Sequence, residues 1–93
     1  MRFPPVVEDL AVVVEKRLPS ARVRSLIEQH PLVRGARAFD VYEGDRIAAG
    51  KKSLAFSVTY QSADHTLDDK EVAQARQSIV ERLRRELGAE LRG

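Results

Sequence analysis

Residues 51–60 read KKSLAFSVTY, and large apolar side chains alternate there with small ones. The apolar parity is Leu54, Phe56, Val58 and Tyr60, and the small parity is Ser53, Ala55, Ser57 and Thr59. Because successive side chains of a strand point to opposite faces, this pattern predicts a strand with one face in a core and the other free of it.

The segment that follows predicts a long amphipathic helix. Its apolar side chains recur at three- and four-residue steps: Val72, Ala75, Ile79, Leu83 and Leu87. Asp68 with Glu71 three residues later matches a capping box, and Gly88 fits the position just after a helix end. A short last strand is expected over residues 89–92.

The first half of the chain predicts two further strands around a shorter helix. Residues 9–15 are apolar on both parities, as in a central strand. Pro19 and Ser20 open a helix, with Ser20 as the expected N-cap, and Pro31 ends that segment. Residues 33–42 form the next strand, in which Phe39 and Val41 alternate with Asp40 and Tyr42.

The order strand–helix–strand–strand–helix–strand predicts an α+β fold of the ferredoxin-like, split βαβ class. Four antiparallel strands form its sheet, and both helices cover one face. We expect Phe39, Val41, Phe56 and Val12 beneath the helices, packed with Leu83. The opposite parity then places Asp40, Tyr42 and Ser53 on the helix-free face. The arginines of the last helix, among them Arg76, are expected on its solvent side.

Composition restricts the function classes. The chain has 93 residues, 43% hydrophobic and 32% charged, which predicts one globular domain. Cysteine is absent, so disulfides, thiol catalysis and thiolate-bound metals are excluded, and a reducing, cytoplasmic location is expected. No apolar run is long enough for a bilayer, so no membrane partner is expected. His30 and His65 stand far apart, and no metal site is predicted.

Ferredoxin-like folds serve many functions, so the alternatives are weighed by residues. An acylphosphatase-like hydrolase positions its water with an asparagine, and this sequence has none. Ser53 has no histidine near it in sequence or expected register, so no pair of nucleophile and base is found and no catalytic residue is predicted. An RNA recognition motif would need a stacking aromatic where Leu54 stands.

Two motifs carry a more specific resemblance: Phe39-Asp40-Val41-Tyr42-Glu43-Gly44 and Gly50-Lys51-Lys52-Ser53-Leu54-Ala55-Phe56. With Arg2-Phe3-Pro4, Asp9-Leu10-Ala11 and the final Glu90-Leu91-Arg92-Gly93, they make the chain similar to the ferredoxin-fold anticodon-binding domain. That domain ends the beta subunit of bacterial phenylalanyl-tRNA synthetases. The resemblance covers residues 2–93 in order.

The resemblance implies an RNA-binding site made of Asp40, Tyr42, Ser53 and Arg92. In the family, the aspartate and tyrosine of the first motif and the serine of the second contact the anticodon loop. Arg92, in the terminal Leu-Arg-Gly, is a candidate phosphate or base contact. Simpler interpretations stay open: Tyr42 could only end a strand, Asp40 could pair with Arg37, and Ser53 could be an ordinary solvent-facing residue.

The resemblance also implies the setting of the domain. Residues 1–93 would be one anticodon-binding domain taken from a longer phenylalanine–tRNA ligase beta subunit, with Met1 as an added start residue. Its partners would be the phenylalanine tRNA anticodon loop, the rest of the beta subunit and the alpha subunit. The family uses ATP and magnesium, and no cofactor is expected within this domain. A freestanding RNA-binding or regulatory module and a domain-packing module remain the alternatives.

Overall fold

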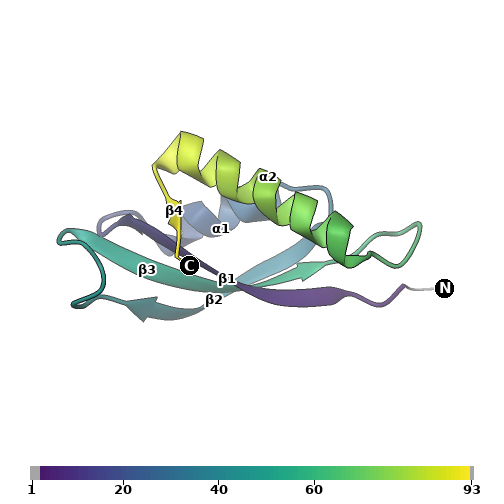
Figure 1. Ribbon diagram of the computed structural model, residues 1–93, viewed down its shortest axis with the longest axis horizontal. Coiled ribbons are helices and arrows are strands. Elements are labelled where there is room, and N and C mark those ends of the chain that lie inside the picture. The colour runs from purple at the N-terminus through teal and green to yellow at the C-terminus, as the bar shows by residue number, and fades with distance from the viewer. Residues whose placement is uncertain (1–2, 93) are drawn as a thin grey trace.

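The computed structural model describes residues 3–92, so the expectations about Met1, Arg2 and Gly93 lie outside the described residues. The elements are β1 (Val6–Glu15), α1 (Ser20–Glu28), β2 (Val33–Tyr42), β3 (Lys51–Tyr60), α2 (Asp69–Leu87) and β4 (Glu90–Leu91). The sheet order is β2-β3-β1-β4, and neighbouring strands pair antiparallel. Both helices lie on one side of the sheet (Figure 1). The predicted ferredoxin-like α+β fold is confirmed.

The ends of the long helix follow the predicted local chemistry. The Asp68 carboxylate accepts a hydrogen bond from the Glu71 amide at 2.8 Å, and the Glu71 side chain accepts one from the Asp68 amide at 3.2 Å. Gly88 ends the helix with φ of +66°, a conformation that suits a residue without Cβ. The shorter helix differs from expectation: Pro19 is its N-cap, and Ser20 is already its first residue.

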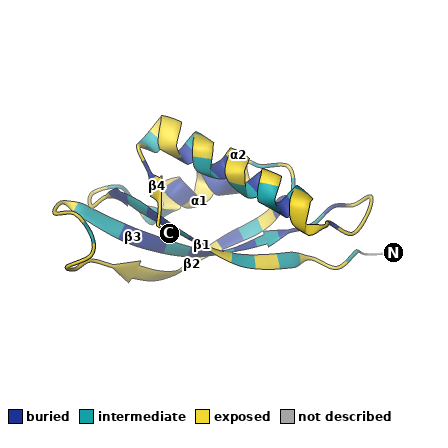
Figure 2. Ribbon diagram, in the orientation of Figure 1, coloured by how far each residue is buried: buried dark blue, intermediate teal, exposed yellow. Residues whose placement is uncertain are grey.

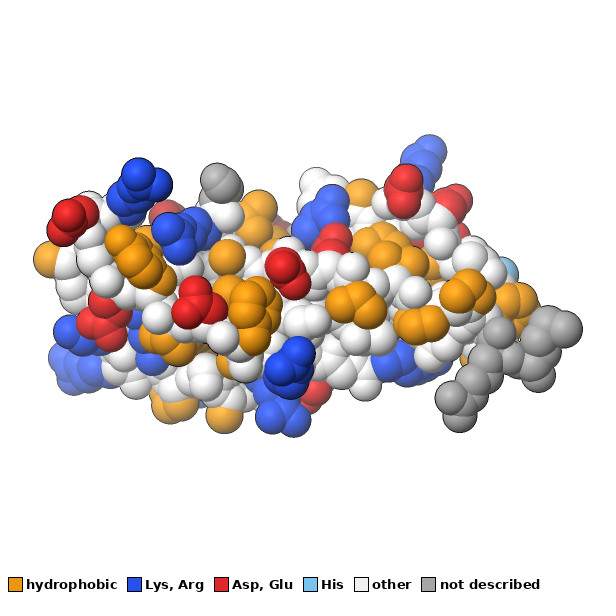
Figure 3. Space-filling model, turned by 90° about the horizontal axis from the view of Figure 1, so that it is seen from below, with side chains coloured by type: hydrophobic (Ala, Val, Ile, Leu, Met, Phe, Trp, Pro, Cys, Tyr) orange, Lys and Arg blue, Asp and Glu red, His pale blue; other side chains and the backbone are white. Residues whose placement is uncertain are grey.

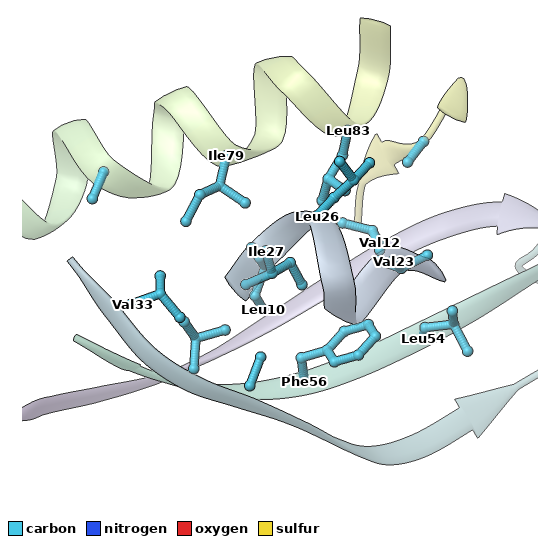
Figure 4. Close-up of a cluster of buried hydrophobic side chains, with 14 of the residues drawn as sticks. Leu10, Val12, Val23, Leu26, Ile27, Val33, Leu54, Phe56, Ile79 and Leu83 are labelled. Carbon is cyan, nitrogen blue, oxygen red and sulfur yellow. The ribbon is translucent and has the colours of Figure 1, made fainter. Parts of the chain in front are cut away.

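The core lies between the sheet and the helices (Figure 4). Phe56 is fully buried, and Val12 and Leu83 are each 1% exposed, so these three predictions are confirmed. Within residues 3–92 neither helix has both the length and the hydrophobicity needed to cross a membrane.

The expectation that Phe39 and Val41 lie beneath the helices is wrong. Phe39 is 49% exposed and Val41 56% exposed. The register jumps from Ala38 opposite Phe56 to Asp40 opposite Ala55, so Phe39 is the extra residue of a β-bulge. Val41 still pairs with the buried Leu54, but the end of β2 curves away from the helices, and this part of the strand is exposed (Figures 1 and 2).

A polar contact joins the sheet to α2. The Glu8 carboxylate of β1 accepts a hydrogen bond from the Tyr60 hydroxyl at 2.8 Å and one from the Arg76 guanidinium at 2.6 Å. Burial of the ring and the adjacent Glu8 raise the pKa of Tyr60. Arg76 therefore does not simply face solvent, as the helical pattern suggested. Its contact fixes the long helix over β1 and β3.

Candidate nucleic-acid interface

The strand register brings the predicted residues of the two motifs side by side. Tyr42 lies directly opposite Ser53, and Asp40 lies opposite Ala55, two positions further along β3. These pairs alternate with Val41–Leu54 and Ala38–Phe56, whose β3 members are buried in the core. Asp40, Tyr42 and Ser53 therefore share the helix-free face of the sheet, as predicted.

Arg92 reaches the same place from the opposite edge of the sheet. Its amide donates a 2.9 Å hydrogen bond to the Ala11 carbonyl, which extends the β1–β4 pairing by one residue. Its side chain then crosses β1: the guanidinium lies 4.9 Å from the centre of the Tyr42 ring and donates to the Ser53 hydroxyl at 3.4 Å. A cation over an aromatic face at this distance is attracted by the ring quadrupole.

The members of this group differ in accessibility. Ser53 is 2% exposed, whereas Tyr42 is 36% exposed and Asp40 is also exposed. Within residues 3–92 the Asp40 carboxylate makes no hydrogen bond or ion pair, so the expected alternative of a pair with Arg37 is not found. The structure thus presents an exposed ring, a free carboxylate, a guanidinium, and a hydroxyl that the guanidinium partly covers.

β3 carries small side chains on this face of the sheet. Ser53, Ala55 and Ser57 lie opposite larger side chains of β2, and β1 is their neighbour on the other side. Figure 3, seen from below the sheet, shows hydrophobic side chains in separate clusters among basic and acidic ones, with no single-sign field.

Several nearby charges are already paired. Lys51 lies 3.1 Å from Glu15, and Lys16 lies 3.0 Å from Glu43. These exposed pairs contribute little stability, since solvent screens them. They reduce the positive field at this end of the sheet.

Sequence reasoning missed Phe39 as a surface residue because strict alternation was assumed across Phe39 and Val41. Ala36 and Ala38 lie on the helix side and occupy even positions, whereas the apolar Phe39 and Val41 occupy odd positions. This change of alternation within one strand indicates one extra residue. Phe39 follows Ala38, which pairs on the helix side, and precedes Asp40, which pairs on the free side.

No described group of residues is arranged for a metal. Within residues 3–92 no set of three or more His, Cys, Asp or Glu side chains gathers as ligands would. An open groove of about 790 Å³ runs along α2 and is lined by Ala73, Gln77, Val80 and Leu91 among others. It contains none of the predicted site residues and lacks a cluster of convergent polar groups typical of a cofactor site.

Comparison with known proteins agrees with the arrangement of the motifs. The chain is 48% identical to the phenylalanine–tRNA ligase beta subunit of Anaeromyxobacter dehalogenans over 92 residues, 44% to that of Geobacillus kaustophilus over 94, and 43% to that of Dehalococcoides mccartyi over 91. These matches cover 98–99% of this chain and 11–12% of the relatives. The chain thus spans about an eighth of the length of these relatives.

A family model spans all of the described residues. The model of the ferredoxin-fold anticodon binding domain matches residues 1–92, which include both strands of the Asp40–Tyr42–Ser53 group and the arginine that reaches it. The order of elements agrees with that family, and the relatives are more than 40% identical over nearly the whole chain. This chain belongs to the family of ferredoxin-fold anticodon-binding domains.

Proposed function

We propose that this chain is the anticodon-binding domain of a phenylalanine–tRNA ligase beta subunit and that its helix-free sheet face holds the anticodon loop of phenylalanine tRNA. The relatives above carry that ligase name, and the matched region is a small part of each. In this proposal residues 1–93 are one domain of a longer chain. Its partners are the tRNA, the rest of the beta subunit and the alpha subunit, and ATP and magnesium act outside this domain.

The observation that carries the proposal is the convergence of Tyr42 from β2, Ser53 from β3 and Arg92 from just after β4, with Asp40 beside them. The three are joined by the 4.9 Å approach of Arg92 to the ring and its 3.4 Å contact with the hydroxyl. A sheet face that presents an exposed aromatic beside an unpaired carboxylate suits an unstacked base, whose ring can stack while its edge is read.

Each side chain has a distinct role in the proposal. Tyr42 stacks on a base, a contact worth about 1–3 kcal/mol in single-strand sites. Asp40 only accepts hydrogen bonds when ionised, so it suits the N1–H and N2–H donors of guanine. Arg92 turns from the ring toward a phosphate, and this movement frees the Ser53 hydroxyl to bond the base. The cation–π contact that is lost is worth only about 0.5–1 kcal/mol at an exposed site.

The experiment measures binding of the chain to a hairpin RNA with the phenylalanine anticodon loop, by fluorescence anisotropy. Tyr42→Ala should weaken binding by roughly 5- to 150-fold, from the stacking energy. The matched control Val41→Ala removes an exposed side chain from the other face of the same strand and should leave affinity unchanged. Equal losses for both variants, or no binding by the wild type, would contradict the proposal.

Asp40→Asn separates base reading from general charge. The substitution keeps the shape but turns one acceptor into a donor, so affinity for the matched loop should fall by roughly 5- to 150-fold, as for other directional base contacts. Loops altered at the base that Asp40 reads should be affected less. If Asn tightened binding to all loops equally, Asp40 would be only a background negative charge.

Arg92→Gln tests the phosphate contact. Loss of one phosphate contact should weaken binding to every loop and lower the slope of log affinity against log salt by about 0.7–0.9. If Arg92 instead only blocks the Tyr42 ring, Arg92→Gln should strengthen binding and leave the salt slope unchanged. The sign of the change therefore distinguishes the two roles.

A further inference from the structure

We propose that the helix-free face holds a second, neighbouring base of the same loop, which stacks on Phe39 while Arg37 binds its phosphate. This inference rests on the proposed function and extends the site along β2, away from Tyr42. Neither residue belongs to the predicted site group. The observation that carries it is the β-bulge, which turns an expected core aromatic into a half-exposed one beside Asp40.

The bulge places Phe39 on the same face as Asp40. Ala38 pairs with the buried Phe56 on the helix side, and Asp40 pairs with Ala55 on the free side. In a bulge of this kind two residues of one strand oppose a single residue of the partner, so Phe39 and Asp40 both oppose Ala55. At 49% exposure Phe39 leaves a large part of its ring uncovered on the surface.

An aromatic ring with half of its area in water needs an explanation, because a conformation that buried it would be favoured by about 25 cal/mol per Å². The β-bulge instead leaves the Phe39 ring exposed next to the unpaired Asp40 carboxylate. Phe39 and Tyr42 then flank Asp40 on one strand. That arrangement gives two stacking surfaces with one hydrogen-bond acceptor between them.

The spacing suits two bases that are not stacked on each other. Three residues of regular strand cover about 10 Å, and neighbouring bases in a stacked helix are only about 3.4 Å apart. The two bases must therefore be splayed, as they are in single-stranded loops read by sheet faces. A stacked pair could not reach both rings.

Arg37 supplies charge of the sign that the RNA backbone requires. It is exposed, lies opposite the small Ser57 on the same face, and makes no ion pair within residues 3–92. Asp9 occupies the same row two strands away, across Ser57, and is not paired with it. A free guanidinium two positions before Phe39 can bind the phosphate of the base stacked there, while the Asp40 carboxylate repels phosphates from the space between the rings.

The test uses the same hairpin RNA and a series in which each loop nucleotide in turn lacks its base. Phe39→Ala and Phe39→Leu should each weaken binding by roughly 5- to 150-fold, since both remove the ring and only the first removes apolar bulk. Val41→Ala is the matched control, and a thermal melt of each variant confirms folding. For one RNA of the series, Phe39→Ala should bind as tightly as the wild type, because the base that stacks on Phe39 is missing. For another RNA, Tyr42→Ala should bind as tightly as the wild type. The two missing bases should belong to adjacent nucleotides.

Arg37→Gln should weaken binding to the whole series and lower the salt slope by about 0.7–0.9. Three results would overturn the inference: unchanged affinity in both Phe39 variants, both ring losses vanishing at the same nucleotide, or an Arg37→Gln salt slope equal to that of the wild type. In each case Tyr42→Ala still reports on the first base. A wild-type chain that binds no hairpin would refute the proposed function itself.

Discussion

The two phenylalanines of the central motifs offer a direct test of the bulge, because the same substitution should have opposite consequences at each. Phe56 is fully buried and pairs with Leu10 and Ala38, whereas Phe39 is 49% exposed. Phe56→Ala should cost about 3–5 kcal/mol, the loss of a buried ring plus the cavity it leaves. Phe39→Ala should change the free energy of unfolding by no more than about 0.5 kcal/mol, as for most surface substitutions.

The size of the Phe56→Ala effect is large for this chain. At 0.05–0.15 kcal/mol per residue, 93 residues have a total stability of roughly 5–14 kcal/mol. With a urea m-value of about 1.3 kcal/mol per M, a loss of 3–5 kcal/mol lowers the midpoint by about 2–4 M. If the total stability lies at the lower end of its range, the Phe56→Ala variant should be unfolded even without urea.

The assay is urea unfolding followed by far-ultraviolet circular dichroism, with both variants and the wild type at one temperature. Val41→Ala serves as a second exposed control on β2. If Phe39→Ala destabilised the chain as much as Phe56→Ala, Phe39 would belong to the core. The bulge would then be misplaced, and with it the shared face of Asp40 and Phe39.

Two further predictions concern the contacts around α2. Glu8→Ala should lower the free energy of unfolding in urea by about 1–3 kcal/mol, because it leaves the buried Tyr60 hydroxyl without its acceptor and Arg76 without its partner. Glu8→Gln keeps an acceptor for Tyr60 and should lower it less. Equal losses for the two variants would mean that the Tyr60 contact contributes nothing. The 2.6 Å bond to Glu71 raises the pKa of His65, so the folded chain binds this proton more tightly than the unfolded one. The stabilisation is complete below the unfolded pKa near 6.5 and is lost as pH rises through the folded pKa. His65→Gln should remove that part of the fall in unfolding midpoint with pH, and an unchanged profile would show that His65 is not its source.

Much of the fold could be read from short-range patterns. The capping box at Asp68 and Glu71, the glycine at 88 and the alternation of residues 51–60 all appear in the structure as expected. Each depends on chemistry within a few residues: a carboxylate that accepts a nearby amide, a backbone that needs a positive φ, a pleat that turns every second side chain inward. The face shared by Asp40, Tyr42 and Ser53 followed from the same alternation, because the extra residue precedes Asp40 and leaves the phase of residues 40–42 intact.

Other features depend on partners that are distant in the chain. Whether Phe39 is core or surface depends on how β2 pairs with β3, and as the extra residue of that ladder it is 49% exposed instead of buried. The contact of Arg92 with Tyr42 and Ser53 exists only because β4 pairs with β1 and the side chain then crosses a whole strand. The buried state of Ser53 follows from that crossing. Local sequence specifies which residues can form a strand, but the hydrogen-bond register between strands decides which side chains meet, because it is set by the whole packed sheet at once.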